Sequence, residues 1–230
     1  MAAKGLLGAC LAAVLLWCAV PSAGAAERRV ALVIANSGYA GAPAPSAAAN
    51  AAAVAEALRK ADFEVTVARD LGYRELTTTI DRYQNRLAAA DVGLVYFTGY
   101  TLTLAEQTFL VPVDVKMGAL EDALFKMLEF DRVLSRVQDA SYRAIVILDS
   151  VVPNPVADAL GPAGNVRPVA AAPPPMARLL IAFNHRPGVS TGMAASDGAG
   201  PYAEALAREL VKPGLELRKA LAAVEETVSA

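Results

Sequence analysis

Side chains that could do chemistry are few in this chain, and three of them lie within two residues of the end of an apolar run. Asp149 and Ser150 come after the run at 144–148, and His185, the one histidine in the sequence, comes after the run at 179–183. A serine hydroxyl becomes a nucleophile when an adjacent imidazole accepts its proton. Ser150 and His185 could therefore form a hydrolytic dyad if the two runs are neighbouring strands. The alternative is that Ser150 is a small packing residue and His185 a solvated loop residue, with Asp149 organising its loop by hydrogen bonds.

Thiol and metal chemistry are not expected in the exported form of the chain. The first 25 residues read as a secretory signal, with one lysine, an apolar run at 5–20 and small residues at 23–25. Both cysteines, Cys10 and Cys18, lie inside this segment, so cleavage after Ala25 would leave no thiol. One histidine and no cysteine provide no familiar metal-ligand set, and no glycine-rich phosphate loop is present. We therefore expect no metal and no cofactor.

The remaining chain, 26–230, has a length that suits one domain with a full core. The apolar run near the start is shorter than the roughly 18–20 residues that span a bilayer. We therefore expect a cleaved signal, no stable membrane anchor, and a periplasmic or secreted location. Because the signal contains one lysine and no acid, its removal lowers the formal net charge from −2 to −3. No basic block is present, so nucleic acid is not expected as a partner.

Apolar runs alternate with amphipathic helical patterns along this chain, which predicts an α/β domain around a mostly parallel sheet. We expect strands at 30–34, 63–67, 92–97, 144–148 and 179–183. We expect helices at 47–60, 74–87, 130–138, 202–211 and 217–228. A hairpin at 102–113 and an internal linker at 152–175, rich in proline, alanine and glycine, complete the predicted single domain.

Several motifs carry a resemblance to a known family. Residues 145–155, Ile-Val-Ile-Leu-Asp-Ser-Val-Val-Pro-Asn-Pro, resemble the strand-end motif of bacterial caspase-like domains (peptidase C14, caspase p20, metacaspase-related). That motif usually reads as an apolar strand followed by Asp-Ala-Cys-Arg-Asp-Asn-Pro. Residues 96–101, Tyr-Phe-Thr-Gly-Tyr-Thr, are similar to the family's Tyr-Tyr-Ala-Gly-His-Gly. Leu-Val-Pro-Val-Asp at 110–114 and Leu-Ile-Ala-Phe at 180–183 are similar to two further family segments and follow in the right order.

The resemblance implies a caspase-like three-layer α/β/α sandwich of about five strands, with a site at the carboxyl ends of the third and fourth strands. In active relatives, a histidine after the third strand assists a cysteine thiolate after the fourth. The matching positions here are Tyr100 and Val151. Valine has neither a lone pair nor a proton to offer, and tyrosine, with a pKa of about 10, is a poor general base. Ala51, Thr101 and Glu106 also depart from the family pattern.

These substitutions favour a caspase-like pseudoenzyme that acts as a binding or regulatory module. Its groove candidates are Asn50, Tyr96, Gly99 and Asp149, and its partner would be a protein or peptide, including an active caspase-like relative. The strand at 179–183 is expected at the sheet edge, where it could also pair two copies into a homodimer. Two alternatives stay open: an active hydrolase that uses the serine–histidine dyad, and a degenerate gene product without activity.

Overall fold

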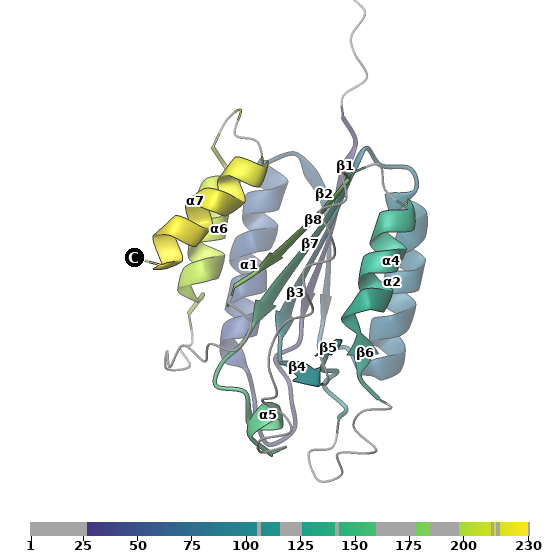
Figure 1. Cartoon of the computed structure of the whole chain (residues 1–230), viewed down its shortest axis with the longest axis vertical. Coiled ribbons are helices and arrows are strands. Elements are labelled where there is room, and N and C mark those ends of the chain that lie inside the picture. Colours follow the sequence, from purple (N-terminus) through teal and green to yellow (C-terminus); the bar gives the residue numbers. More distant parts are fainter. Residues whose placement is uncertain are drawn as a thin grey trace, which may run out of the picture.

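A five-stranded parallel sheet forms the centre of the domain, with the strand order β2-β1-β3-β7-β8 (Figure 1). Its strands are β1 (Arg29–Ala35), β2 (Phe63–Arg69), β3 (Val92–Gly99), β7 (Arg143–Ser150) and β8 (Leu179–Phe183). The computed structural model describes residues 27–104, 107–115, 126–140, 143–159, 178–184, 198–212, 214 and 217–229. The predicted signal at 1–25 lies outside the described residues. All five predicted strands are confirmed, each with ends within two residues of those expected.

Burial explains why the central strands are continuous apolar runs. Every residue of β3 is buried, and so is every residue of β1 except the first. The outer strands β2 and β8 are largely half-buried. Strands covered by helices on both faces have no solvent side, so the alternation of polar and apolar residues disappears. The edge position expected for residues 179–183 is confirmed, because β8 pairs only with β7 among the described strands.

Helices cover both faces of the sheet and complete the predicted three-layer α/β/α sandwich (Figure 1). One face is covered by α1 (Pro45–Lys60), α6 (Pro201–Leu210) and α7 (Leu217–Ser229), and the other by α2 (Tyr73–Leu87) and α4 (Phe130–Ala140). In α2, the buried side chains recur at three- and four-residue spacing, as an amphipathic helix on a sheet requires. None of the helices in the described part of the chain is both long and apolar enough to span a bilayer.

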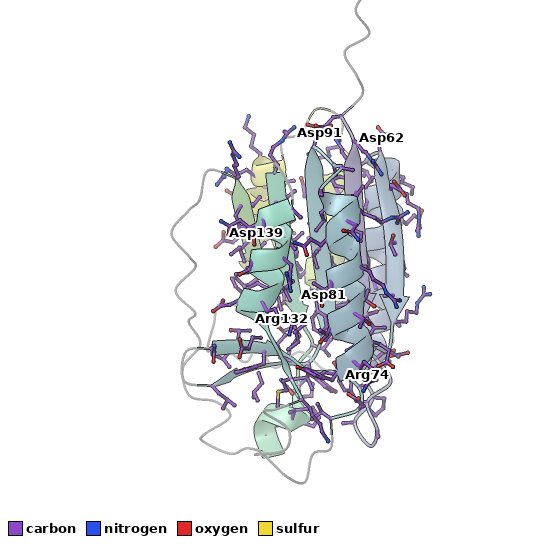
Figure 2. All side chains as sticks on the ribbon, turned by 90° about the vertical axis from the view of Figure 1, so that its right-hand side faces the viewer. Asp62, Arg74, Asp81, Asp91, Arg132 and Asp139 are labelled. Atoms are coloured by element: carbon purple, nitrogen blue, oxygen red, sulfur yellow. The ribbon has the colours of Figure 1, made fainter. Side chains whose placement is uncertain are left out.

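The α2–α4 layer combines a buried apolar contact with ion pairs at the surface. Asp81 of α2 lies between the two helices, beside Arg132 of α4 (Figure 2). Its carboxylate oxygens lie 3.5 Å from the Arg132 guanidinium and 3.1 Å from that of Arg136. Ion pairs this exposed contribute at most about 1 kcal/mol each. Burial of the apolar faces of both helices against the sheet is therefore the main source of stability of this layer.

A second, smaller sheet lies where the main strands end (Figure 1). In it, β4 (Thr101–Leu104) and β5 (Gln107–Leu110) pair antiparallel, which confirms the hairpin predicted at 102–113, and β6 (Leu128–Glu129) adds a third strand. The range predicted as a linker, 152–175, begins with a short helix, α5 (Pro155–Ala159). The side-chain oxygen of Asn154 accepts a hydrogen bond from the backbone N–H of Val156 at 3.1 Å and so caps this helix. Residues 160–177 lie outside the described residues.

Candidate functional site

The strands β3 and β7 end side by side and bring two of the predicted site positions together. Their parallel register pairs Gly99 with Ser150. Just beyond, the backbone N–H of Val151 donates to the carbonyl of Gly99 at 2.9 Å. Tyr100 and Val151 therefore follow adjacent strands at the carboxyl edge of the sheet, which is where open α/β sheets bind their ligands.

Both of these side chains are packed into an apolar cluster. Tyr100 is 3% exposed and Val151 is 7% exposed. They share the cluster with side chains from the loop after β1, the start of α1, the small sheet and α5: Tyr39, Ala42, Ala44, Ala47, Leu102, Phe109, Val111, Met127 and Val156. The edge of the sheet where a nucleophile would have to meet a substrate is thus filled by hydrocarbon and aromatic groups.

The ring of Tyr39 supports Tyr100 and also ties the surrounding loops together. The two ring centroids lie 4.5 Å apart with a tilt of 36°. The Tyr39 hydroxyl donates to the carbonyl of Val111 at 2.9 Å and accepts from the backbone N–H of Tyr100 at 2.9 Å. The Tyr100 hydroxyl donates to the carbonyl of Pro43 at 3.4 Å. Burial raises the pKa of both tyrosines, so both hydroxyls stay protonated at neutral pH and neither can act as a general base.

Gly99 occupies a position that no other residue could take without local movement. Its φ is +153°, which L side chains rarely adopt. A Cβ atom there would lie 2.7 Å from the Tyr39 hydroxyl and 3.1 Å from the Asn36 carbonyl oxygen. The glycine predicted as a groove residue therefore has a packing reason: it lets the backbone between β3 and β4 approach the tyrosine hydroxyl closely.

A buried network of polar side chains lies on the α1 side of the same strand ends. The Asp149 carboxylate accepts hydrogen bonds from the Asn50 amide at 3.0 Å, from the Asn184 amide at 2.6 Å and from the Tyr96 hydroxyl. Asn50 also accepts the backbone N–H of Gly200 at 2.7 Å. The network thus connects β3, β7, the end of β8, α1 and the start of α6, which are far apart in sequence.

Burial raises the pKa of Asp149 to about 7, because the carboxylate loses its water while the hydrogen bonds from Tyr96, Asn184 and Asn50 recover only part of that cost. The same burial, together with the negative charge of Asp149, raises the pKa of Tyr96. Asp149 can therefore change its charge near neutral pH inside a closed network. This agrees with the sequence-based interpretation that Asp149 organises its loop by hydrogen bonds.

Three of the predicted groove residues lie in the interior of the domain. Asn50, Tyr96 and Asp149 are all buried, and their polar atoms bind one another. In this conformation these three side chains are almost fully excluded from solvent, and their role in a binding groove stays a prediction. Asn184 was not among the predicted site residues. The one available signal was its position directly after the apolar run 179–183, which resembles the place of Asp149 after 144–148.

A comparison with protein-family models matches residues 28–230 to the caspase domain of peptidase C14. The chain belongs to this family. The comparison with curated proteins finds no match. The family assignment agrees with the sheet order and the helix layers described above.

In this caspase domain, Ser150 lies on the opposite side of β7 from the Asp149 carboxylate, as strand geometry requires. Its hydroxyl shares a hydrogen bond of 2.7 Å with the Thr101 hydroxyl, and its backbone N–H donates to the Asn184 side chain at 2.9 Å. His185 lies outside the described residues, so the predicted Ser150–His185 dyad stays a prediction. Within the described ranges, no three His, Cys, Asp or Glu side chains are grouped as a metal ion would need.

Proposed function

We propose that this caspase domain is a pseudoenzyme without cysteine peptidase activity, and that it acts as a protein- or peptide-binding, regulatory module. The observation that carries the proposal is the packing of Tyr100 and Val151 into one buried apolar cluster at the ends of β3 and β7. These are the two positions where the resemblance to active relatives would place the histidine and the cysteine.

The chemistry supports this proposal. Cysteine peptidase catalysis needs a thiolate, an adjacent base and a substrate carbonyl about 3–3.5 Å from the sulfur. Val151 supplies no nucleophile, and burial keeps the hydroxyl of Tyr100 protonated. The cluster also leaves little exposed surface at these positions for a scissile bond to approach. Restoring activity would require both new side chains and an opening of the cluster.

A binding role is supported by the contrast between the lost chemistry and the intact core. The sheet, both helix layers and the Asp149 network are complete, so the domain keeps a defined surface after losing its catalytic groups. In the part of the chain that the structure describes, no strand pairs with the outer side of β8. An extended segment of a partner, whether a peptide, an active caspase-like relative or a second copy, could add to that edge. If the predicted signal is cleaved, we expect this partner in the periplasm or outside the cell.

The first experiment is hydrolysis of a mixed peptide library by purified residues 26–230, beside the Ser150→Ala and His185→Ala variants. We expect no cleavage by any of the three. Cleavage by the unmodified chain that both variants abolish would overturn the proposal and establish a serine–histidine hydrolase. Sedimentation that gives a monomer at high protein concentration would count against homodimer formation through β8.

The assignment of the two catalytic positions has its own test, because the pKa of a thiol at position 151 should depend on the side chain at position 100. We expect the Val151→Cys thiol to have a lower pKa when Tyr100→His is added, since a neighbouring imidazolium stabilises the thiolate. The readout is the pH dependence of alkylation by iodoacetamide. Val152→Cys with and without Tyr100→His is the matched control, because Val152 follows Val151 and is only half-buried. Equal thiol pKa values in the Val151→Cys single and double variants would contradict the assignment.

A further inference from the structure

A cavity of about 710 Å³ lies at the amino ends of the strands, at the opposite edge of the sheet from Tyr100 and Val151. The first residues of all five main strands line it, together with the last residues of α1 and α6 and the start of α7. In Figure 1 this is the end of the sheet from which the strand arrows start. No residue of the apolar cluster around Tyr100 contributes to it.

The charged lining of this cavity is mainly cationic, although the whole chain is slightly acidic. Six basic side chains from six different segments line it: Arg29, Lys60, Arg143, Arg178, Lys212 and Arg218. Three acidic side chains accompany them: Glu27, Asp62 and Glu209. The lining therefore carries an excess of three positive charges, against a formal net charge of −2 for the entire chain.

Ion pairs at the cavity reduce this excess but do not remove it. Glu27 contacts two guanidinium groups at once, those of Arg29 at 2.7 Å and of Arg143. Lys60 pairs at 2.6 Å with Glu56, which lies on the exposed surface of α1 and does not line the cavity. Glu209 pairs with Lys212 at 2.6 Å. When Glu56 is counted, six basic side chains face four acidic ones, so an excess of two positive charges remains. A cleft lined mainly by one sign of charge attracts ligands of the other sign.

The floor of the cavity is apolar. Val92, Ile145 and Leu179 at the strand starts are buried beneath it, and Phe63 and Leu180 are half-buried at its side. The volume falls within the range of about 300–1,000 Å³ that is typical of sites for small organic ligands. An inorganic anion would leave this floor uncovered, whereas a ligand with an apolar body would cover it.

We propose that this cavity binds an amphiphilic organic anion, whose apolar body lies on the strand starts and whose carboxylate, sulfonate or phosphate group contacts the basic rim. This is a second site, separate from the vestigial catalytic edge, and it does not depend on the proposed loss of peptidase activity. The rim side chains are exposed, so the contribution of charge to affinity falls as the salt concentration rises.

The test uses the fluorescent anion 1-anilinonaphthalene-8-sulfonate with purified residues 26–230. We expect saturable binding that weakens with salt, and weaker binding of N-phenyl-1-naphthylamine, which has the same rings without the sulfonate. The backbone amides of Val92, Ile145 and Leu180 should shift in NMR spectra, while those of Val111 and Val151 at the other edge should not. Binding of the neutral analogue at equal affinity, or amide shifts confined to the other edge, would overturn the proposal.

Charge variants test the rim directly. We expect Lys60→Gln and Arg218→Gln each to raise the dissociation constant about two- to fivefold, as removal of one exposed charge does, and together by roughly the product of the two effects. Arg74→Gln is the matched control, because Arg74 is an exposed arginine at the other end of the sheet, on α2 (Figure 2). Equal dissociation constants for the unmodified chain and all four variants would show that the rim does not hold the anion.

Discussion

Asp149 provides a sharp test of the buried network, because burial raises its pKa from 3.8 to about 7. The folded domain then holds the proton of Asp149 more tightly than the unfolded chain does. The contribution of this group to stability is fully present below about pH 4 and is lost as the pH rises through 7. The shift of about three pH units corresponds to about 4 kcal/mol in total, since each unit is worth about 1.4 kcal/mol. Of this, about 2–3 kcal/mol is lost between pH 5 and pH 8.

The assay is urea unfolding of residues 26–230 at several pH values between 5 and 8, for the unmodified chain and for Asp149→Asn. The variant keeps the size of the side chain but cannot titrate. We therefore expect the difference in unfolding free energy between the two proteins to change by about 2–3 kcal/mol over this range, in favour of the variant at high pH. Subtracting the two curves removes the contribution of every other titrating group that the proteins share.

Asp139→Asn is the matched control, because it removes the same charge from an exposed position on α4 (Figure 2). We expect this variant to keep most of the pH dependence of the unmodified chain. Parallel curves for the unmodified chain and Asp149→Asn between pH 5 and pH 8 would refute the reasoning. They would mean that Asp149 is as well solvated in the folded domain as in the unfolded chain.

Two further predictions concern the packing around Tyr100, both measured by urea unfolding. Gly99→Ala should destabilise the domain by at least about 2 kcal/mol, because a Cβ there meets the Tyr39 hydroxyl at 2.7 Å on a backbone with positive φ. Gly41→Ala is the control, because Gly41 also has a positive φ but a Cβ there would meet nothing within 4 Å, so the variant should cost only about 1 kcal/mol. Equal losses of unfolding free energy in the two variants would contradict the close approach at Gly99. Tyr39→Phe should cost about 2 kcal/mol, because the buried backbone N–H of Tyr100 loses its partner, while the carbonyl of Val111 keeps the Asn36 amide. Tyr100→Phe, which removes one long hydrogen bond, should cost less than about 1 kcal/mol. A larger loss of stability in Tyr100→Phe than in Tyr39→Phe would refute the roles given to the two hydroxyls.

The order and type of the main elements could be predicted from the sequence because they depend on local patterns. A strand that is buried on both faces must be apolar throughout, so 92–97 and 144–148 stand out as uninterrupted runs. A helix on a sheet must repeat its apolar residues every three or four positions, which identified 74–87 and 130–138. The two-residue strand β6 and the five-residue helix α5 are too short to produce a recognisable period.

The sequence by itself determined the family resemblance and the side chains at positions 100 and 151, because motif order and residue identity are properties of the linear chain. Only the tertiary structure decided that Tyr100 and Val151 are closed into one apolar cluster with Tyr39 and Phe109. It also decided that Asn184 reaches Asp149, and that basic residues from six segments surround one cavity. The physical reason is that burial and desolvation depend on which segments pack together in space. Those contacts join residues as far apart in sequence as Asn50 and Gly200, which are 150 positions apart. No local sequence pattern predicts contacts of this kind.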